Sequence, residues 1–341
     1  MKKTVHVIAH THWDRAWYWP VERFRVRLVE CVKAVIRELR AHPDYIFTFD
    51  GQTLMLEDYL EVCPEDRGYL QQCAREGRIR LGPMYVLSDL YCTGGEALVR
   101  NLLIGARWCQ EFGAEPARIL HMPDTFGITP SIPMIARGFG IRAFTFMRGM
   151  PGEVPGLTDM IRVPDTGGDC REDTRYFLWK SADGSEIPVI RLRDGYANAA
   201  ARIGREQGAN LPSEDCYARA LEAAAKKWDT PPGKLVFLMA GVDHQVPWPG
   251  QKPAMDLAGG QGDYRFVFSS LDAVADEAFA AGTAGLPRCE GVEFHGDGAA
   301  GVLGGTISAR IYLKVANAEI EQMLLHQVEP AAAFLRLLGV E

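Results

Sequence analysis

Four predicted β-strands in this chain are each followed by polar side chains of the kinds that bind metals or transfer protons. These side chains are His12 with Asp14, Asp124, Arg148 and Asp243. In proteins with parallel strands, ligand sites lie in the crevice outside the carboxyl ends of the strands. Because four separate strands bring imidazole, carboxylate and guanidinium groups to that end, we expect one site with metal-binding or acid/base chemistry.

The densest position is the segment HTHWD at residues 10–14, which follows a short apolar strand predicted at residues 4–9. Imidazole and carboxylate groups are good zinc ligands, and residues two apart on an extended segment point the same way. His10, His12 and Asp14 are each two residues apart and would lie on the same face of an extended segment, so the spacing leaves open which histidine binds the metal. The alternative is a strand-end histidine whose ring is hydrogen-bonded to a backbone carbonyl.

Each of the other polar positions has an ordinary interpretation when it is taken alone. Asp124 could cap the helix that follows it. Arg148 could be a surface charge, but a guanidinium near carboxylates usually pairs with one of them. Asp243 follows an apolar strand and could be a loop residue. Their common place at strand ends favours a site, and nearby aromatic residues suit the binding of a sugar: Trp13, Trp17, Tyr18, Trp19 and Phe126.

The spacing of apolar residues predicts strands and helices in alternation along most of the chain. Strands are predicted at residues 4–9, 45–49, 79–81, 118–122, 142–147, 176–180, 187–191, 234–239 and 265–268. Helices are predicted at residues 24–41, 52–63, 69–76, 96–112, 131–138, 214–227, 271–281 and 306–338, the last broken at Pro330. Residues 182–185 (ADGS) predict a hairpin. The alternation predicts an α/β fold with a mostly parallel sheet covered by helices.

The composition is that of a globular protein with a sizeable core. The chain has 341 residues, of which 47% are hydrophobic and 24% charged, and a formal net charge of −7. This acidic balance, without a long basic run, argues against a nucleic-acid partner. No apolar stretch reaches the roughly 20 residues of a membrane span, and no signal peptide is recognisable, so we expect a cytoplasmic protein. We expect the eight scattered cysteines to be reduced thiols.

With these residues identified, the sequence resembles glycoside hydrolase family 38, the zinc-dependent retaining α-mannosidases. The motifs that support the resemblance are HTHWDRAW at 10–17, PDTFG at 123–127, FMR at 146–148 and GVD at 241–243, with FDGQT at 49–53 and SARIYLK at 308–314. The resemblance implies a seven-stranded, mostly parallel β/α barrel-like glycoside hydrolase/deacetylase fold. It also implies a catalytic domain at 1–285, then a glycine-rich connector and the beginning of a helical bundle at 286–341. From this resemblance we expect the C-terminal β-sandwich domains of the family to be absent.

The resemblance also implies roles for individual residues. The zinc ligands would be His12, Asp14 and Asp124. Asp124 would also be the nucleophile, oriented and kept ionised by Arg148, and Asp243 would be the general acid/base. The substrate, an α-mannoside or mannose-containing oligosaccharide, would be bound by Trp17, Phe126 and His244. Retaining hydrolysis needs two carboxyl groups about 5–5.5 Å apart, one ionised and one protonated.

Two departures from the family bear on activity. Leu303 stands where the family has its fourth zinc ligand, a histidine, and His295 is the candidate substitute. The chain is also much shorter than family members, so we expect apolar surface on residues 311–338 to be covered by a homo-oligomer or a complementing chain. The alternatives to an α-mannosidase are a metal-dependent carbohydrate deacetylase and a catalytically weak, sugar-binding fragment.

Overall fold

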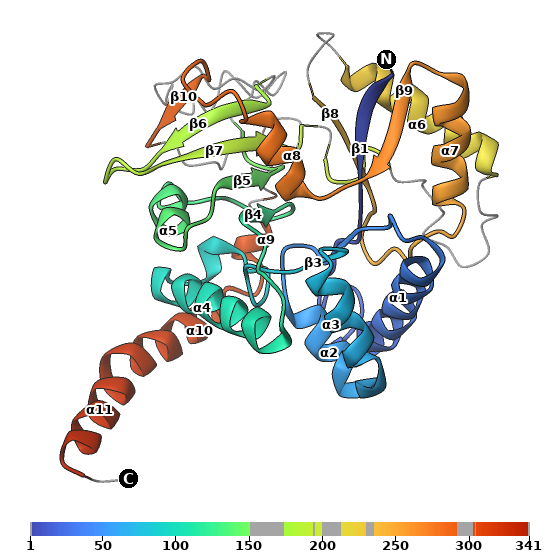
Figure 1. Ribbon diagram of the computed structural model, residues 1–341. Helices are drawn as coiled ribbons and strands as arrows, with labels where there is room; N and C mark the ends of the chain where they lie inside the picture. The colour runs from blue at the N-terminus through green and yellow to red at the C-terminus, as the bar shows by residue number, and fades with distance from the viewer. Residues whose placement is uncertain are drawn as a thin grey trace.

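The computed structural model describes residues 2–150, 174–193, 195–199, 213–229, 235–291, 303 and 305–339. The described strands form two five-stranded sheets, with helices packed around them (Figure 1). The predicted α/β class and mostly parallel pairing are confirmed.

The first sheet contains the strand that leads into the HTHWD segment. Its order is β3-β2-β1-β8, with β9 paired to the N-terminal half of β1, and every pairing is parallel. The bounds are β1 (Lys3–His10), β2 (Phe47–Thr48), β3 (Ile79–Arg80), β8 (Val236–Ala240) and β9 (Tyr264–Phe268). β1 is buried from Val5 to His10 because it lies between β8 on one side and β9 and β2 on the other. It is therefore the central strand of this sheet.

The second sheet has the order β10-β6-β7-β5-β4. Its bounds are β4 (Ile119–Met122), β5 (Ala143–Phe146), β6 (Tyr176–Lys180), β7 (Glu186–Arg191) and β10 (Arg288–Glu290). Only β6 and β7 pair antiparallel, across a turn in which Gly184 has a positive φ of 88°. The predicted hairpin is therefore confirmed, and a glycine occupies the position that needs left-handed backbone.

Helices cover the sheets and bury apolar stripes against them (Figure 1). Their bounds are α1 (Val21–Ala41), α2 (Leu54–Val62), α3 (Arg67–Arg75), α4 (Gly95–Phe112), α5 (Ile132–Gly138), α6 (Glu214–Trp228), α7 (Gln251–Gln261) and α8 (Leu271–Ala278), with short 3₁₀ turns η1 (Pro64–Asp66) and η2 (Leu90–Cys92). The sequence pattern missed α7. Pro253, Gly259 and Gly260 lower its helix propensity, and packing against α6 and β9 compensates.

Two backbone hydrogen bonds link the two sheets or the segments next to their strands. The N–H of Ala117, just before β4, donates to the carbonyl of Leu81, just after β3, at 2.8 Å. The N–H of Ala199, eight residues after β7, donates to the carbonyl of Met239 in β8 at 3.0 Å. Among the described residues no strand ladder joins the two sheets, so the pairing gives two sheets rather than one closed seven-stranded barrel.

The C-terminal segment begins with α9 (Gly305–Ser308) and a turn in which Arg310 has a positive φ of 50°. One long helical stretch follows and extends from the body beyond α4 (Figure 1). This stretch comprises α10 (Ile311–Met323), the π-helical turn η3 (Leu324–Val328) and α11 (Glu329–Leu337). The predicted break at Pro330 is wrong, because the proline lies in the first turn of α11, directly after the π turn. No described residue of α10 or α11 is buried, which bears out the predicted uncovered apolar surface.

Two further expectations from the sequence can be compared with the structure. No described helix is both long and apolar enough to cross a membrane. Cys289 is disulfide-bonded, so the expectation of reduced thiols is wrong at this residue, whereas six other described cysteines are free: Cys31, Cys63, Cys73, Cys92, Cys109 and Cys216. The division of the chain at residue 285 remains a prediction.

Candidate active site

The ends of β1 and β8 lie against each other and bring two of the predicted residues together. His12 and Asp243 form an isolated parallel bridge, and the N–H of His244 donates to the carbonyl of His12 at 2.8 Å. A Cβ atom on Gly241 would lie 1.8 Å from the carbonyl oxygen of His10, so only glycine allows this approach. The GVD motif therefore positions Asp243 by letting its backbone touch the HTHWD segment.

The ring of His12 faces two carboxylates on one side and a third on the other. Its Nε2 lies 3.7 Å from Asp14 Oδ1 and 3.7 Å from Asp124 Oδ2. Its Nδ1 lies 2.9 Å from Asp50 Oδ2, and the same Asp50 oxygen accepts a 2.9 Å hydrogen bond from the backbone N–H of Trp13. A buried carboxylate behind a histidine fixes the orientation of the ring, as it does for metal-binding histidines. Asp50 is thus a positioning residue that the sequence pattern did not single out.

Charges around His12 give the site a negative potential. Burial by itself lowers the pKa of His12, but the carboxylates of Asp50 and Asp14 outweigh burial and raise that pKa well above its ordinary value. The pKa of Asp50 is lowered despite complete burial, because His12 favours its ionised form. A cluster that attracts a proton this strongly also favours a metal cation at the same place.

The structure decides which histidine faces the cluster. The Nε2 of His10 donates to the backbone carbonyl of Tyr196 at 2.8 Å, and burial lowers the pKa of His10. His10 therefore has the ordinary interpretation of a strand-end histidine bonded to a carbonyl. His12 faces Asp14 and Asp124 instead, so it is the candidate ligand.

Asp124 and Arg148 come from the ends of β4 and β5 and form an ion pair through the Nε of Arg148. Burial raises the pKa of Asp124 above its ordinary value and outweighs the opposite effects of His12 and Arg148. Within the protein alone, Arg148 therefore orients Asp124 but does not by itself hold its pKa down, and a metal cation beside it would favour the ionised form.

Tyr196 joins the two carboxylates that were predicted to react, and sequence reasoning missed it. Its hydroxyl donates to Asp243 Oδ1 at 2.8 Å and lies 3.4 Å from Asp124 Oδ2. Burial, followed by the charges of Asp124 and Asp243, raises the pKa of Tyr196 far above its ordinary value, so the hydroxyl keeps its proton. The available signal was position: Tyr196 follows the carboxyl end of β7, as the other site residues follow theirs.

The aromatic residues predicted to bind substrate lie in different surroundings. Trp17 is 58% exposed, and Phe126 is half-buried with the guanidinium carbon of Arg148 5.1 Å from its ring centroid. Phe126 is held through its backbone N–H, which donates to Asp89 Oδ1 at 2.9 Å. Gly127 has a φ of 102°, and a Cβ atom there would lie 2.1 Å from the ring of Tyr91.

His244, the third residue predicted to bind substrate, lies in buried surroundings. Its side chain is 0% exposed, its ring stacks on Phe24 with 4.2 Å between centroids, and its Nε2 donates to the carbonyl of Asp14 at 3.1 Å. Burial lowers its pKa, so the ring is neutral near pH 7. The structure thus places the His244 ring against the backbone of Asp14, and the role of His244 in binding substrate remains a prediction.

The predicted zinc ligands are near one another but do not form a closed metal site. Within the described ranges, no group of three or more His, Cys, Asp or Glu side chains lies closely enough to hold a metal ion. Ligand atoms around a tetrahedral zinc at about 2.1 Å are about 3.4 Å apart, slightly closer than the 3.7 Å separations around His12. His295 lies outside the described residues. The donor types and the support of Asp50 fit zinc chemistry.

Comparison with known proteins identifies the family. Residues 2–261 match the family model of the glycosyl hydrolases family 38 N-terminal domain. A putative mannosylglycerate hydrolase of Halalkalibacterium halodurans is 32% identical over 339 residues, which is 97% of this chain and 36% of the relative. Human alpha-mannosidase 2C1 is 33% identical over 194 residues, 54% of this chain and 16% of that protein.

The structural comparison agrees with the sequence comparison. The crystal structure of an alpha-mannosidase from Enterococcus faecalis V583 has a TM-score of 0.78 and 29% identity, and the match covers 95% of this chain and 34% of that one. These two matches, to the hydrolase of Halalkalibacterium halodurans and to the Enterococcus faecalis structure, cover nearly all of this chain but only about a third of each relative. From its match to the N-terminal domain model and to these relatives, the chain belongs to glycosyl hydrolase family 38.

Proposed function

We propose that this chain contains the catalytic site of a retaining glycoside hydrolase that cleaves terminal α-D-mannosidic bonds. The proposal rests on the carboxylates of Asp124 and Asp243, which lie 3.4 and 2.8 Å from one hydroxyl group, that of Tyr196. These two oxygens are therefore no further apart than the two distances together. That limit is shorter than the about 6.5–9.5 Å between the carboxyl groups of inverting enzymes, and it allows the about 5–5.5 Å of retaining ones.

In the proposed reaction, Asp124 attacks the anomeric carbon of the mannose. The bond from that carbon to the leaving oxygen breaks, and Asp243 donates its proton to this oxygen. Asp243 then takes a proton from water, which attacks the anomeric carbon and releases Asp124. Arg148 is paired with Asp124 and keeps the attacking carboxylate aimed, while Tyr196 holds the two carboxylates in a fixed relation.

We propose zinc as the resident metal, held by His12, Asp14 and Asp124, with His295 as a candidate fourth ligand. Zinc would supply a positive charge that binds sugar hydroxyl groups and favours the ionised nucleophile. The support is the donor set, the 3.7 Å approach of His12 to both carboxylates, and the orientation of His12 by Asp50.

Trp17 and Phe126 are the proposed walls for the mannose ring, because Trp17 is exposed near His244 and Phe126 is half-buried beside Arg148, the partner of Asp124. Since the relative that matches nearly the whole chain is named a putative mannosylglycerate hydrolase, small mannosides with a charged aglycone belong among the substrates to test. The family membership and the pair of carboxylates favour hydrolysis of a glycoside over deacetylation.

We further propose that β1, β2, β3, β4, β5, β7 and β8 form a barrel-like ring around the site. The backbone hydrogen bonds from Ala117 to Leu81 and from Ala199 to Met239 support β3 beside β4 and the segment after β7 beside β8 in this order. We also propose the catalytic domain at 1–285 and the beginning of a helical domain at 286–341. The exposed apolar side chains of α10 and α11 support a second copy of the chain or a complementing chain as partner.

The test is hydrolysis of an aryl α-mannoside by the zinc-supplemented protein and by Asp124→Ala. The matched control is Asp229→Ala, because Asp229 is also largely buried, paired with a cation (Lys3) and contacted by a tyrosine hydroxyl (Tyr264, 3.3 Å), but lies elsewhere. We expect loss of turnover only in Asp124→Ala, and release of α-mannose as the first product, measured by NMR. Turnover retained in Asp124→Ala, or first release of the β-anomer, would contradict the proposal.

The two alternative functions give different results in the same experiment. A deacetylase would release acetate from acetylated sugars and leave α-mannosides intact. A sugar-binding fragment would bind mannose without turnover, and the apolar Leu303 at the family's ligand position is the feature that favours it.

A further inference from the structure

Two imidazole rings face the two oxygens of the buried Asp50 carboxylate. Asp50 Oδ2 lies 2.9 Å from the Nδ1 of His12. The same oxygen accepts hydrogen bonds from the backbone N–H of Trp13 at 2.9 Å and from the Nε2 of Gln52 at 3.3 Å. The other oxygen, Oδ1, lies 4.0 Å from the Nε2 of His121 in β4. The donors around Asp50 are thus gathered on Oδ2, and Oδ1 faces the second histidine.

Two buried polar atoms between Asp50 and His121 lack hydrogen-bond partners. Among the described residues, neither Asp50 Oδ1 nor His121 Nε2 makes a hydrogen bond. Although burial acts in the opposite direction, His12 keeps the pKa of Asp50 below its ordinary value, so the carboxylate is ionised. A buried ionised oxygen without a donor costs free energy. The 4.0 Å separation exceeds a hydrogen bond by about 1 Å, so a small rotation of one side chain gives Oδ1 its donor.

The tautomer of His121 follows from its two neighbours. Burial lowers the pKa of His121 to about 3, so the ring is neutral near pH 7 and one of its nitrogens bears a hydrogen. Its Nδ1 lies 2.7 Å from the hydroxyl oxygen of Thr145, which can donate or accept. Its Nε2 faces a carboxylate, which only accepts hydrogen bonds and repels a lone pair. The hydrogen is therefore on Nε2, and the Thr145 hydroxyl donates to Nδ1.

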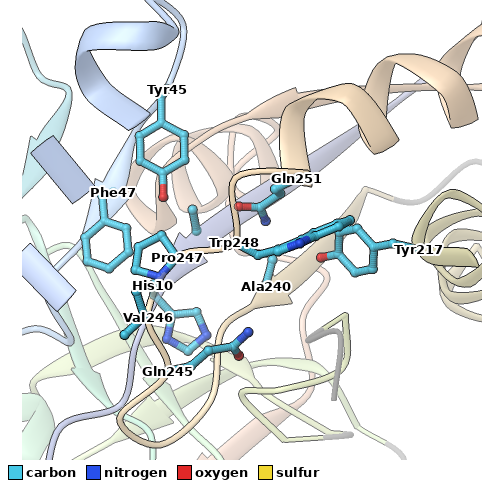
Figure 2. A pocket seen from close by; sticks show the side chains of 11 residues that line it. His10, Tyr45, Phe47, Tyr217, Ala240, Gln245, Val246, Pro247, Trp248 and Gln251 are labelled. Carbon is cyan, nitrogen blue, oxygen red and sulfur yellow. The ribbon is translucent and has the colours of Figure 1, made fainter. Parts of the chain in front are cut away.

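His10 is another buried histidine near Asp50, and it does not supply the missing donor. Burial lowers its pKa, so its ring is neutral, and its Nε2 donates to the carbonyl of Tyr196 at 2.8 Å. Its Nδ1 therefore bears no hydrogen. Figure 2 shows the His10 ring in a small cavity, which neither Asp50 nor His121 lines. Of these two histidines, only His121 can donate to Asp50.

We propose that His121, held by Thr145, is a positioning residue for the candidate metal ligand His12. His121 donates from Nε2 to one oxygen of Asp50, and the other oxygen accepts the Nδ1 hydrogen of His12. The lone pair of His12 is then on Nε2, the nitrogen that faces the other candidate ligands. These four side chains join the ends of β1 and β2 in one sheet to β4 and β5 in the other. The role of His121 toward a metal rests on the proposed zinc site.

The first test measures the tautomer of His121 in the metal-free protein. Long-range ¹H–¹⁵N NMR correlations distinguish a ring nitrogen that bears a hydrogen from one that does not, and the spectrum of His121→Gln assigns the signals. We expect a neutral ring with its hydrogen on Nε2 near pH 7. A hydrogen on Nδ1, or a charged ring, would overturn the proposal. This measurement involves neither zinc nor turnover.

The second test compares zinc affinities by competition with a chromogenic chelator. His121→Leu removes both ring nitrogens, whereas the amide of His121→Gln can still donate from near the position of Nε2. We expect zinc binding to weaken about tenfold in His121→Leu and to return to within about threefold of the parent protein in His121→Gln.

The matched control is His6→Leu. His6 is also a buried histidine between a hydroxyl and a carboxylate, because its Nδ1 lies 2.9 Å from Ser269 Oγ and its Nε2 lies 3.0 Å from Glu277 Oε2. It belongs to β1, six residues before His12, so its loss should leave the zinc affinity unchanged.

Thermal unfolding checks that each variant is folded. Unchanged zinc affinity in folded His121→Leu, or an equal loss of affinity in His6→Leu, would refute the positioning role of His121. If the parent protein bound no zinc although His121 bore its hydrogen on Nε2, the proposed function would be wrong, and the order of hydrogen bonds around Asp50 would still be supported.

Discussion

Replacing Tyr196 by phenylalanine tests whether one hydroxyl group organises the two reacting carboxylates. The change removes the 2.8 Å hydrogen bond to Asp243 and the 3.4 Å contact with Asp124, and it keeps the ring that packs 4.9 Å from His12. A hydrogen bond to a charged group contributes about 1.5–3 kcal/mol. If that contribution is lost in the transition state, kcat/KM should fall by a factor of about 10 to 150.

The assay is steady-state hydrolysis of an aryl α-mannoside at saturating zinc, with circular dichroism and thermal unfolding to check that the variant is folded. Tyr217→Phe is the matched control, because it removes a buried tyrosine hydroxyl that is bonded to a backbone carbonyl. We expect its kcat/KM to stay within about twofold of the parent protein, an effect below about 0.5 kcal/mol. If a folded Tyr196→Phe protein kept more than half of the parent kcat/KM, the hydroxyl would not organise the carboxylates, and the reasoning would be refuted.

Two other predictions concern buried polar residues below the site. Asp50→Asn removes the charge that orients His12, so it should weaken zinc binding about 10- to 100-fold. Competition with a chromogenic chelator measures this affinity. An unchanged affinity would show that Asp50 does not orient a zinc ligand. Burial lowers the pKa of His121 to about 3, so the folded protein does not take up the proton that the unfolded chain binds below about pH 6.5. The contribution of His121 to the free energy of unfolding is thus fully present above pH 6.5 and falls by about 2 kcal/mol when the pH is lowered to 5. In urea unfolding, the free energy of unfolding of His121→Gln should therefore decrease between pH 7.5 and 5 by about 2 kcal/mol less than that of the parent protein. An equal decline in the variant and the parent would show that His121 is not buried and neutral.

Local pattern determined the class of the fold and the neighbourhood of the site. Apolar runs of four to eight residues predicted most strands to within a residue or two, because a strand buried on both faces needs such a run. The rule that parallel strands present their carboxyl ends at one edge then placed His12, Asp14, Asp124 and Arg148 in one cluster. Both inferences depend only on the residue types along each segment.

The arrangement of the strands into sheets was not accessible in the same way. Strand position follows from local periodicity, but the pairing across the two edges depends on single contacts between segments distant in sequence, such as Ala117 with Leu81 and Ala199 with Met239. Helix α7 was missed for a related reason: its glycines and proline disfavour a helix, and contacts with α6 and β9 decide its structure.

Within the site, the sequence by itself determined which chemical groups are present and on which strand ends they lie. Only the tertiary structure decided which way each ring turns and which partner it meets. His10 and His12 have the same parity and type, yet His10 bonds a carbonyl of Tyr196 and His12 faces the carboxylates. Tyr196 contacts Asp243, Asp50 contacts His12, and His244 is buried against Phe24. In each pair the two residues are distant in the sequence. The physical reason is that a side chain's hydrogen-bond partner and burial are set by non-local packing, whereas helix and strand periodicity is set by neighbours in the chain.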